Sequence, residues 1–284
     1  IHGKNHHLDG SFSRHVKSIQ LQTHPGRKIE INHTAHKSLF RATCGGMGLT
    51  GLITEVEVKL IPISSPYISQ SSIRTSCLEE TFEKFEEFEH AQYSVAWIDC
   101  LANAGKMGRG LITFGNHNKS GAEDLSNFCV PKPLNIPFNV PHFVINKTSM
   151  SLFNSMFYHS PQNRKTTDIP LFKFFYPLDI LNSWNRFYGR NGFVQYQFVV
   201  PYEIGLNAFK GLLSKITQSG LGSFLAVLKK LGPANENYLS FPLKGYSLAL
   251  DFQASPDVFS LLQSLDKEII ELGGRLYLSK DALM

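Results

Sequence analysis

Polar residues crowd the first segment of the chain, which reads IHGKNHH. His2, His6 and His7 lie close together with Lys4 between them. No cysteine or histidine pair follows at zinc-finger spacing, so we predict no metal site. A histidine tag is a poor explanation, because tags are runs and this stretch leads into a strand-like segment. We expect a polar turn that either converges on a ligand or is solvated.

A second cluster consists of the glycines in CGGMGLTG. Gly45, Gly46, Gly48 and Gly51 would let the backbone approach a ligand closely and turn its N–H groups toward negative charge. The spacing matches neither the dinucleotide-binding G-x-G-x-x-G pattern nor a P-loop. Taken alone, the cluster is explained better by a tight turn that needs positive φ.

Two lysines and two glutamines lie on strand-like segments. Lys280 follows RLYL and Lys229 lies in VLKKLGP, and partial burial of an ammonium lowers its pKa and makes it a usable base or anion clamp. Strand alternation makes only one of Lys229 and Lys230 face inward. Gln195 and Gln197 in FVQYQFVVP share one face, where amides suit hydroxyl groups. The alternative is that these lysines lie on the surface and have no role in a site.

The elements that must position these residues follow from hydrophobic periodicity. In the first part of the chain we predict a hairpin at 16–21 and 28–34, a helix and glycine turn before a strand at 53–58, a helix at 76–91 and a strand at 93–102. Proline-rich sequence predicts a long loop or lid at 130–170. Pro62 and Pro66 mark a boundary.

The second part of the chain alternates strands with helices. We predict helices at 179–189, 202–220 and 255–274 and strands at 193–201, 224–232, 246–252 and 275–281. This order predicts an α+β fold, with an antiparallel sheet that carries helices on one side.

Composition narrows the function classes. The chain has 284 residues, 42% hydrophobic and 18% charged, which is enough for two globular domains. The charged residues that give its net charge of +5 are scattered along the chain, so we predict no nucleic-acid partner. We do predict a mild attraction to acidic lipid surfaces. The four cysteines are far apart, which favours a reducing, cytoplasmic location. No G-x-S-x-G elbow supports a serine hydrolase.

Five segments together resemble one family of flavoproteins. They read IHGKNHHLDGSFSRHV, FRATCGGMGLTGLI, SWNRFYGRNGFVQYQFVVP, SFLAVLKKLGP and GGRLYLSKD. In this order they resemble the decaprenylphosphoryl-β-D-ribose oxidase family, which has the vanillyl-alcohol oxidase type of FAD-binding fold. The resemblance covers nearly the whole chain and is weakest in the proline-rich segment. It implies a fragment that lacks the pyrophosphate-binding part before Ile1 and the tail after Met284.

The resemblance also implies a layout and a set of site residues. Residues 1–66 would be the C-terminal half of an FAD-binding domain, 67–274 a substrate-binding domain, and 275–284 a return into the FAD-binding domain. FAD would contact Ile1, His2, Gly45, Gly46, Gly48, Ile53 and Tyr277. Substrate would contact Lys4, Trp97, Gln195, Gln197, Val227, Lys229 and Lys280. Two positions depart from the family pattern: Ala249 replaces a cysteine, and the family's pocket tyrosine corresponds to Phe175, with Tyr176 shifted by one.

The implied reaction is FAD-dependent oxidation of the 2′-hydroxyl of a polyprenyl-phosphoryl-β-D-ribose to a ketone, on the route to the arabinose donor for cell walls. Lys280 is the candidate proton acceptor or alkoxide stabiliser, with His2 as the competing choice. The expected partners are an NAD(P)H-dependent keto-reductase and the inner membrane surface, where the protein would be peripheral. Two alternatives stay open: another FAD-dependent sugar or alcohol oxidase of this fold, and a non-catalytic binding protein.

Overall fold

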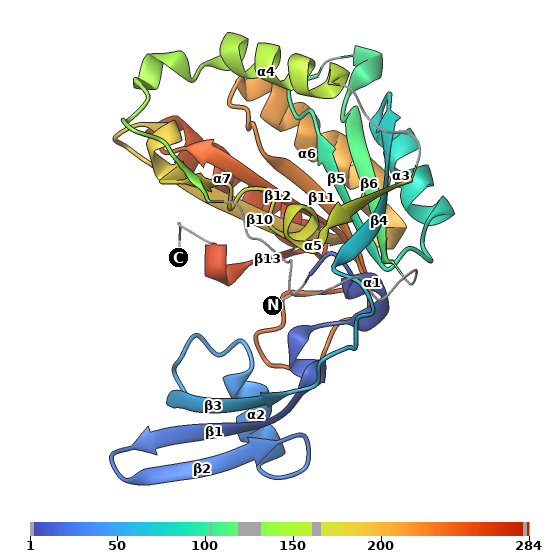
Figure 1. Cartoon of the computed structure of the whole chain (residues 1–284). Helices are drawn as coiled ribbons and strands as arrows, with labels where there is room; N and C mark the ends of the chain where they lie inside the picture. Colours follow the sequence, from blue (N-terminus) through green and yellow to red (C-terminus); the bar gives the residue numbers. More distant parts are fainter. Residues whose placement is uncertain (1–2, 103, 119–131, 161–165, 281–282, 284) are drawn as a thin grey trace.

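Two antiparallel sheets organise the protein. The computed structural model describes residues 3–102, 104–118, 132–160, 166–280 and 283 (Figure 1). A three-stranded sheet has the order β2-β1-β3, and an eight-stranded sheet has the order β13-β10-β12-β11-β5-β6-β4-β8. The small sheet lies below the large one in Figure 1.

The small sheet is the predicted hairpin with one added strand. It comprises β1 (Val16–His24), β2 (Arg27–Asn32) and β3 (Leu52–Val58), with α2 (Lys37–Thr43) beside it. Alternate residues of the hairpin are buried with Phe40 of α2, which gives this sheet its own small core. Most of β3 is exposed, including Ile53, which is 45% exposed. The prediction of a hairpin, a short helix and a strand is confirmed.

The large sheet carries three helices on one face. Its strands are β4 (Tyr67–Thr75), β5 (Tyr93–Ile98), β6 (Gly110–His117), β8 (Thr167–Pro170), β10 (Phe193–Pro201), β11 (Ala226–Leu231), β12 (Gly245–Gln253) and β13 (Arg275–Leu276). The main core joins these strands to α3 (Leu78–Glu87), α6 (Gly205–Ser219) and α7 (Pro256–Glu271). The prediction of an α+β fold with an antiparallel sheet is confirmed. Its helices do not all lie on one side, because α4 (Lys147–His159) and α5 (Leu171–Phe175) contact the other face through Phe157 and Phe174.

Lys229 and Lys230 lie on opposite faces of β11. Lys230 points toward the helices, is 7% exposed, and donates from Nζ to Glu86 Oε2 on α3 at 2.7 Å. Lys229 is partly buried on the other face. The prediction that only one of them faces inward is confirmed: the inward residue is Lys230, and α3 supplies the carboxylate that stabilises it.

The predicted loop at 130–170 contains a helix. α4 (Lys147–His159) begins with a capping box, in which Asn146 accepts from the Thr148 and Ser149 N–H groups and Ser149 accepts from the Asn146 N–H group. Short elements flank it, namely β7 (Leu134–Asn135), η4 (His142–Val144) and α5 (Leu171–Phe175). Residues 130–131 and 161–165 lie outside the described residues. The loop prediction is therefore wrong for 147–159.

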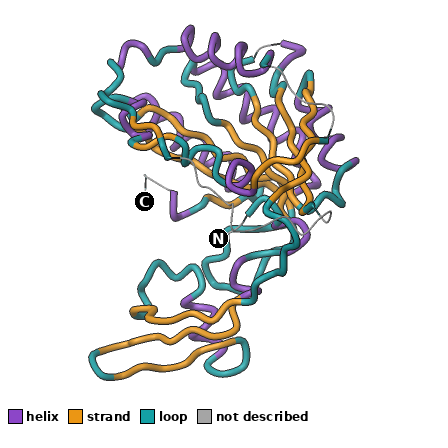
Figure 2. The backbone as a smooth tube through the Cα atoms, in the orientation of Figure 1, coloured by secondary structure: helices purple, strands orange, loops and turns teal. Residues whose placement is uncertain are grey.

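Two other predicted elements are shorter than expected, as the tube in Figure 2 shows. The helix at 179–189 is replaced by β9 (Leu181–Asn182) and the 3₁₀ helix η5 (Trp184–Tyr188), because Ser183 takes a left-handed conformation with φ 61° and interrupts helical hydrogen bonding. The strand at 275–281 pairs only over Arg275–Leu276 and then turns into η7 (Leu278–Lys280). The first segment forms a single helical turn, α1 (His6–Asp9).

Candidate active site

One row of residues crosses four strands on the face of the large sheet that lies opposite α3, α6 and α7. Gln197 lies opposite Ala249, Ala249 opposite Val227, and Val227 opposite Trp97. Directly paired residues of antiparallel strands point to the same side of a sheet. The register therefore brings together Gln197, Val227 and Trp97, which are far apart in sequence and were predicted to line one pocket.

A polar row lies beside it. Ser247 on β12 is paired with Lys229 on β11, and Gln197 Nε2 donates to Ser247 Oγ at 3.0 Å. Burial, with a smaller effect of the Lys280 charge, lowers the pKa of Lys229 to about 8. Near neutral pH an amine with this pKa is present mainly as the ammonium, with a smaller fraction of neutral amine. The ammonium can bind an anion, and the side chain can exchange a proton.

The end of the described chain returns to β10 and brings Lys280 to the same face. The Tyr277 N–H group donates to the Gln197 carbonyl at 2.9 Å, and the Lys280 N–H group donates to the Tyr277 carbonyl at 2.8 Å. Burial lowers the pKa of Lys280, and the negative charge of Asp251 opposes that shift. Lys280 is therefore a partly desolvated amine next to the glutamine-bearing strand.

Asp251 is a site residue that we did not predict. It lies opposite Gln195 in the register of β12 and β10, is 2% exposed, and its Oδ1 accepts from Gln195 Nε2 at 2.9 Å. Burial raises the pKa of its carboxyl, while hydrogen bonding by the Gln195 and Trp184 side chains and the charge of Lys280 oppose the increase. The signal was present in the sequence, since alternation in YSLALDF places this aspartate on the same face as Ala249.

Lys4 reaches the same region from the N-terminal segment. Its Nζ donates to the Phe174 carbonyl at 2.8 Å and to the Phe175 carbonyl at 3.2 Å, at the end of α5. Burial, and then repulsion by Lys229, lowers the pKa of Lys4 to about 8. Phe175 lies against Lys4, whereas Tyr176 is 54% exposed, so Phe175 is the residue that faces this region.

The charges on this face favour an anionic ligand. Lys229 repels Lys4, and Lys280 repels Lys229. Asp251 supplies one opposing charge, which acts on Lys280. A partly desolvated cluster with excess positive charge attracts anions strongly. Among the described residues, no group of three histidine, cysteine or acidic side chains could hold a metal ion.

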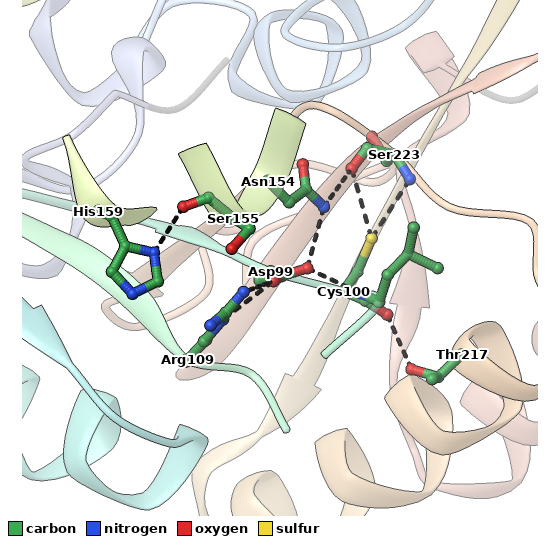
Figure 3. A network of polar contacts seen from close by, with 9 residues as sticks. Asp99, Cys100, Arg109, Asn154, Ser155, His159, Thr217 and Ser223 are labelled. Atoms are coloured by element: carbon green, nitrogen blue, oxygen red, sulfur yellow. Dashed lines mark hydrogen bonds and ion pairs between the residues drawn. The ribbon is translucent and has the colours of Figure 1, made fainter. Parts of the chain in front are cut away.

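Trp97 forms an apolar wall of the site under α4. Its ring lies 4.8 Å from that of Phe157 in an edge-on arrangement, and its Nε1 donates to the Phe224 carbonyl at 2.9 Å. Figure 3 shows the polar contacts that hold α4 there. Asn154 of α4 donates to Asp99 Oδ1 at 3.0 Å, and Arg109 Nη2 donates to Asp99 Oδ2 at 2.9 Å.

The glycine turn of the small sheet contacts the Lys280 segment. Gly45 and Gly48 have φ of 87° and 78°, and Ser279 Oγ lies 3.9 Å from Met47 Sδ. A Cβ at Gly46 would lie 2.0 Å from the Ala42 carbonyl oxygen, so this position also requires glycine. The red η7 segment lies between this turn and the large sheet in Figure 1.

The cofactor residues suggested by the motifs separate into three groups. The glycine turn and Ile53 belong to the small sheet, where open backbone and exposed apolar side chains suit the phosphates and rings of a dinucleotide. Tyr277 packs on Phe241 with ring centroids 4.6 Å apart, beside the lysine-bearing face. Ile1 and His2 lie outside the described residues.

The other two histidines of the first segment hold the structure together. His6 is fully buried, its Nδ1 accepts from the Gly232 N–H group at 2.9 Å, and its Nε2 lies 3.2 Å from Ser11 Oγ. His7 Nε2 contacts the Ala91 carbonyl at 3.0 Å. Both ring positions are set by backbone partners, so these histidines fix the start of the chain against the large sheet.

Comparison with known proteins supports the resemblance. No family model matches the chain. It is 36% identical over 291 residues to decaprenylphosphoryl-β-D-ribose oxidase of Mycolicibacterium smegmatis, an alignment that covers 99% of this chain and 63% of that protein. The similarity therefore runs along nearly the whole of this chain. It thus spans under two thirds of the length of this relative.

A second relative has no assigned activity. It is the uncharacterized protein in the mprA 5′ region of Streptomyces coelicolor, 25% identical over 300 residues, with 99% of this chain and 80% of that protein covered. The oxidase therefore supplies the more informative similarity, and its name states an oxidation of a phosphoryl-linked ribose.

Proposed function

We propose that the chain is the larger part of an FAD-dependent oxidoreductase that oxidises a sugar hydroxyl. Its substrate would be a polyprenyl-phosphoryl-β-D-ribose, and the 2′-hydroxyl would become a ketone. The observation that carries the proposal is the convergence of Lys229, Lys280 and the Gln195–Asp251 pair on one face that the glycine turn approaches through Met47. The similarity to the oxidase supports the same chemistry.

FAD would lie between the small sheet and the lysine-bearing face. Gly45, Gly46, Gly48 and Ile53 would hold it from the small sheet, and Tyr277 from the large one, with Ile1 and His2 completing the site. The domain boundaries 1–66, 67–274 and 275–284 belong to this proposal. When bound, FAD supplies the acceptor for the hydride that leaves the substrate carbon.

The chain's own residues would bind the sugar and take its proton. Gln195 and Gln197 present amides to the sugar hydroxyls, with Trp97 and Val227 as the apolar wall. Lys229 suits the substrate phosphate, because Lys4 already donates to the α5 carbonyls. Lys280 accepts the hydroxyl proton as the neutral amine, with His2 as the competing base. Partial desolvation lowers the pKa of Lys280, which shifts it toward that form.

The outer side of α4 would cover the lipid chain of the substrate. Leu152 and Met156 are 62% and 68% exposed, next to Phe153 and Phe157. Exposed apolar side chains in this arrangement suit a prenyl chain or the boundary of a bilayer. We propose peripheral association with the inner membrane surface. Within the described residues, no helix is long and apolar enough to span a membrane.

The product of this reaction requires a second enzyme. A ketone made at a ribose 2′-carbon can be reduced from its other face, which inverts the configuration and gives an arabinose derivative. An NAD(P)H-dependent keto-reductase would perform that step, and together the two reactions would supply an arabinose donor for cell-wall polysaccharide.

Flavin bleaching tests the proposal. The full-length protein is expected to bind FAD and to lose its flavin absorbance when a polyprenyl-phosphoryl ribose is added without oxygen. Lys280→Ala is expected to retain FAD and to reduce it about 10² to 10⁴ times more slowly. Bleaching by other sugars or alcohols alone would favour a different oxidase of this fold. A protein that binds the ligand but no flavin would favour a non-catalytic binding role.

A further inference from the structure

Phe174 of α5 fills a gap in the large sheet that a glycine leaves open. Gly115 on β6 is paired with Tyr93 on β5, and Tyr93 lies on the same strand face as Trp97, so this part of the sheet faces the candidate active site. A Cβ at Gly115 would lie 2.6 Å from Phe174 Cζ and 2.7 Å from Ile68 Cγ2. The space that a side chain at position 115 would need is therefore occupied by the Phe174 ring.

The ring of Phe174 anchors α5 to the sheet. It is 4% exposed and forms a small core with Ile68 and Tyr93. Tyr93 lies edge-on to Phe174 with ring centroids 5.7 Å apart, and its hydroxyl lies 2.9 Å from His117 Nε2 on β6. Because a close-packed core responds to the addition of even one carbon atom, the position of α5 depends on the space above Gly115.

The C-terminal carbonyls of α5 hold the Lys4 ammonium. Lys4 Nζ donates to the Phe174 carbonyl at 2.8 Å and to the Phe175 carbonyl at 3.2 Å, and it lies 5.1 Å from the centre of the Phe174 ring. The Lys4 carbonyl accepts from the Ser94 N–H group at 3.0 Å, which fixes the Lys4 backbone on β5. An ammonium has three N–H groups, and within the described residues two of them have acceptors, so the direction of the third is set.

We propose that Gly115 is a positioning residue of Lys4: by admitting the Phe174 ring, it places the two α5 carbonyls that orient the ammonium and leave one N–H group for a ligand. This inference rests on the proposed function only for the identity of that ligand, which would be an oxygen atom of the substrate. A donor that is oriented before binding loses less entropy when the ligand arrives. A side chain at position 115 should therefore weaken binding without touching the ligand.

Acetylation of lysines tests this role without substrate. The full-length protein with FAD is treated with limiting acetic anhydride at about pH 9, and the ratio of Lys4 acetylation to Lys229 acetylation is measured by mass spectrometry. Gly115→Ala displaces the Phe174 ring and, with it, the carbonyls that hold Lys4. We expect the ratio to rise about tenfold, because two hydrogen bonds then no longer hold the amine in a partly buried position.

A second change separates this effect from general damage to the sheet. Phe174→Leu removes the ring atoms that a Cβ at position 115 would meet, whereas the overlap with Ile68 stays. The double variant Gly115→Ala and Phe174→Leu should therefore bring the ratio most of the way back to that of the original protein. Gly105→Ala is the matched control, because a Cβ there meets no atom within 4 Å, and it should leave the ratio unchanged.

An unchanged ratio in a folded Gly115→Ala variant would overturn the proposal, as would a ratio in the double variant as high as in Gly115→Ala. Should Gly115→Ala not fold, Phe174→Ala gives the answer. It removes the anchor of α5 and must also raise the ratio, so an unchanged ratio in this variant counts equally against the proposal.

Failure of this inference is distinct from failure of the proposed function. If the ratio rises but polyprenyl-phosphoryl ribose does not bleach the flavin of the original protein, Gly115 positions Lys4 for a different ligand. If the flavin bleaches but the ratio does not change, the oxidation stands and Lys4 is oriented without Gly115. Where both hold, Gly115→Ala should raise KM for the substrate and leave the maximal rate of flavin reduction nearly unchanged, whereas a lower maximal rate at the same KM contradicts the role in binding.

Discussion

Buried titratable side chains give the protein a dependence on pH at the scale of single residues. His6 accepts a hydrogen bond at Nδ1 from the Gly232 N–H group. Protonation of Nδ1 would place its hydrogen against the hydrogen of Gly232 and break this bond. Burial is the main cause that lowers the pKa of His6 to about 4. The folded state therefore binds fewer protons than the unfolded state between about pH 6.5 and 4, and stability is lost as the pH falls through this window.

Replacement of His6 isolates this effect. His6→Leu leaves the Gly232 N–H group without its partner, so we expect the free energy of unfolding at pH 7 to fall by about 1 to 3 kcal/mol. At pH 4.5 the difference between the two proteins should shrink, because the original protein must then protonate His6 on unfolding. Urea unfolding at both pH values measures this. His24→Gln, an exposed change on β1, serves as the control.

An equal loss in His6→Leu at pH 7 and 4.5 would argue against a titrating role for His6. It would leave only a packing role for the imidazole.

Strand alternation predicts well which face of a sheet a residue lies on, but it predicts poorly which residues it contacts. It placed Gln195 and Gln197 on one face, and the register confirms that Gln197 shares its row with Val227. It did not predict that Lys230 is buried, because the stabilising Glu86 lies on a helix 144 residues away. Asp251 was accessible to the same reasoning and was missed because a single acidic residue in an apolar strand attracts little notice.

At the scale of elements, α4 has an inner side with one buried polar residue among apolar contacts and an exposed apolar outer side. Its inner Asn154 is fully buried and donates to Asp99, which Arg109 also contacts. Removal of Asn154 from the helix would leave a buried carboxylate oxygen with fewer donors. The helix is therefore fixed to the sheet edge while its outer residues stay free to contact a lipid.

Changes on the outer side of α4 test its role in lipid binding. The double change Leu152→Ser and Met156→Ser removes two exposed apolar side chains without touching Asn154. Each buried side chain of this size contributes about 1.5 to 3 kcal/mol, so we expect KM for a long-chain substrate to rise at least tenfold. Turnover of a short-chain analogue should stay the same. Steady-state assays with both substrates measure the difference.

A control on another helix makes this result specific. Ile270 on α7 is 64% exposed, and Ile270→Ser should change neither assay. Equal losses with long-chain and short-chain substrates in the α4 variant would count against a lipid-covering helix.

Elements with strong periodicity were predictable, and short elements were not. The apolar stripes of α6 and α7 gave clear helices. α4 was missed because prolines and asparagines on its N-terminal side suggested irregular structure, although Asn146 and Ser149 form a capping box. β13 pairs over two residues, which is too short for alternation to define.

At the scale of the whole molecule, one segment of the large sheet adds contacts to the region of the small sheet. The connecting arm, residues 232–240 between β11 and β12, reaches down to the small sheet. Asn235 Nδ2 donates to Ser11 Oγ at 2.7 Å, and Asn237 Nδ2 donates to Ser13 Oγ at 3.0 Å. Arg41 of α2 donates from Nε to the Glu236 carbonyl at 2.6 Å. These contacts set how the glycine turn faces the lysine-bearing sheet.

No local pattern in the sequence predicts this arrangement. The arm reads GPANENYLS, which indicates a polar turn and nothing about its partners. Its contacts with Ser11 and Ser13 span 224 residues of chain. The motifs identified the two groups of site residues, whereas the contacts of the arm, which link distant parts of the chain, contribute to their relative position.

Weakening the arm should therefore affect the cofactor more than either sheet. In the double variant Asn235→Ala and Asn237→Ala, two hydrogen bonds worth about 0.5 to 1.5 kcal/mol each are lost between the sheets. Both sheets keep their own cores, so circular dichroism should be unchanged. We expect faster hydrogen exchange at residues 11–15 and a rise of about tenfold in the dissociation constant for FAD, because a ligand held from two sides loses affinity when those sides are not prearranged.

Lys17→Ala is the matched control, because it breaks only an exposed ion pair to Glu57 within the small sheet. Unchanged exchange and unchanged FAD affinity in the double variant would show that the cores alone orient the two sheets.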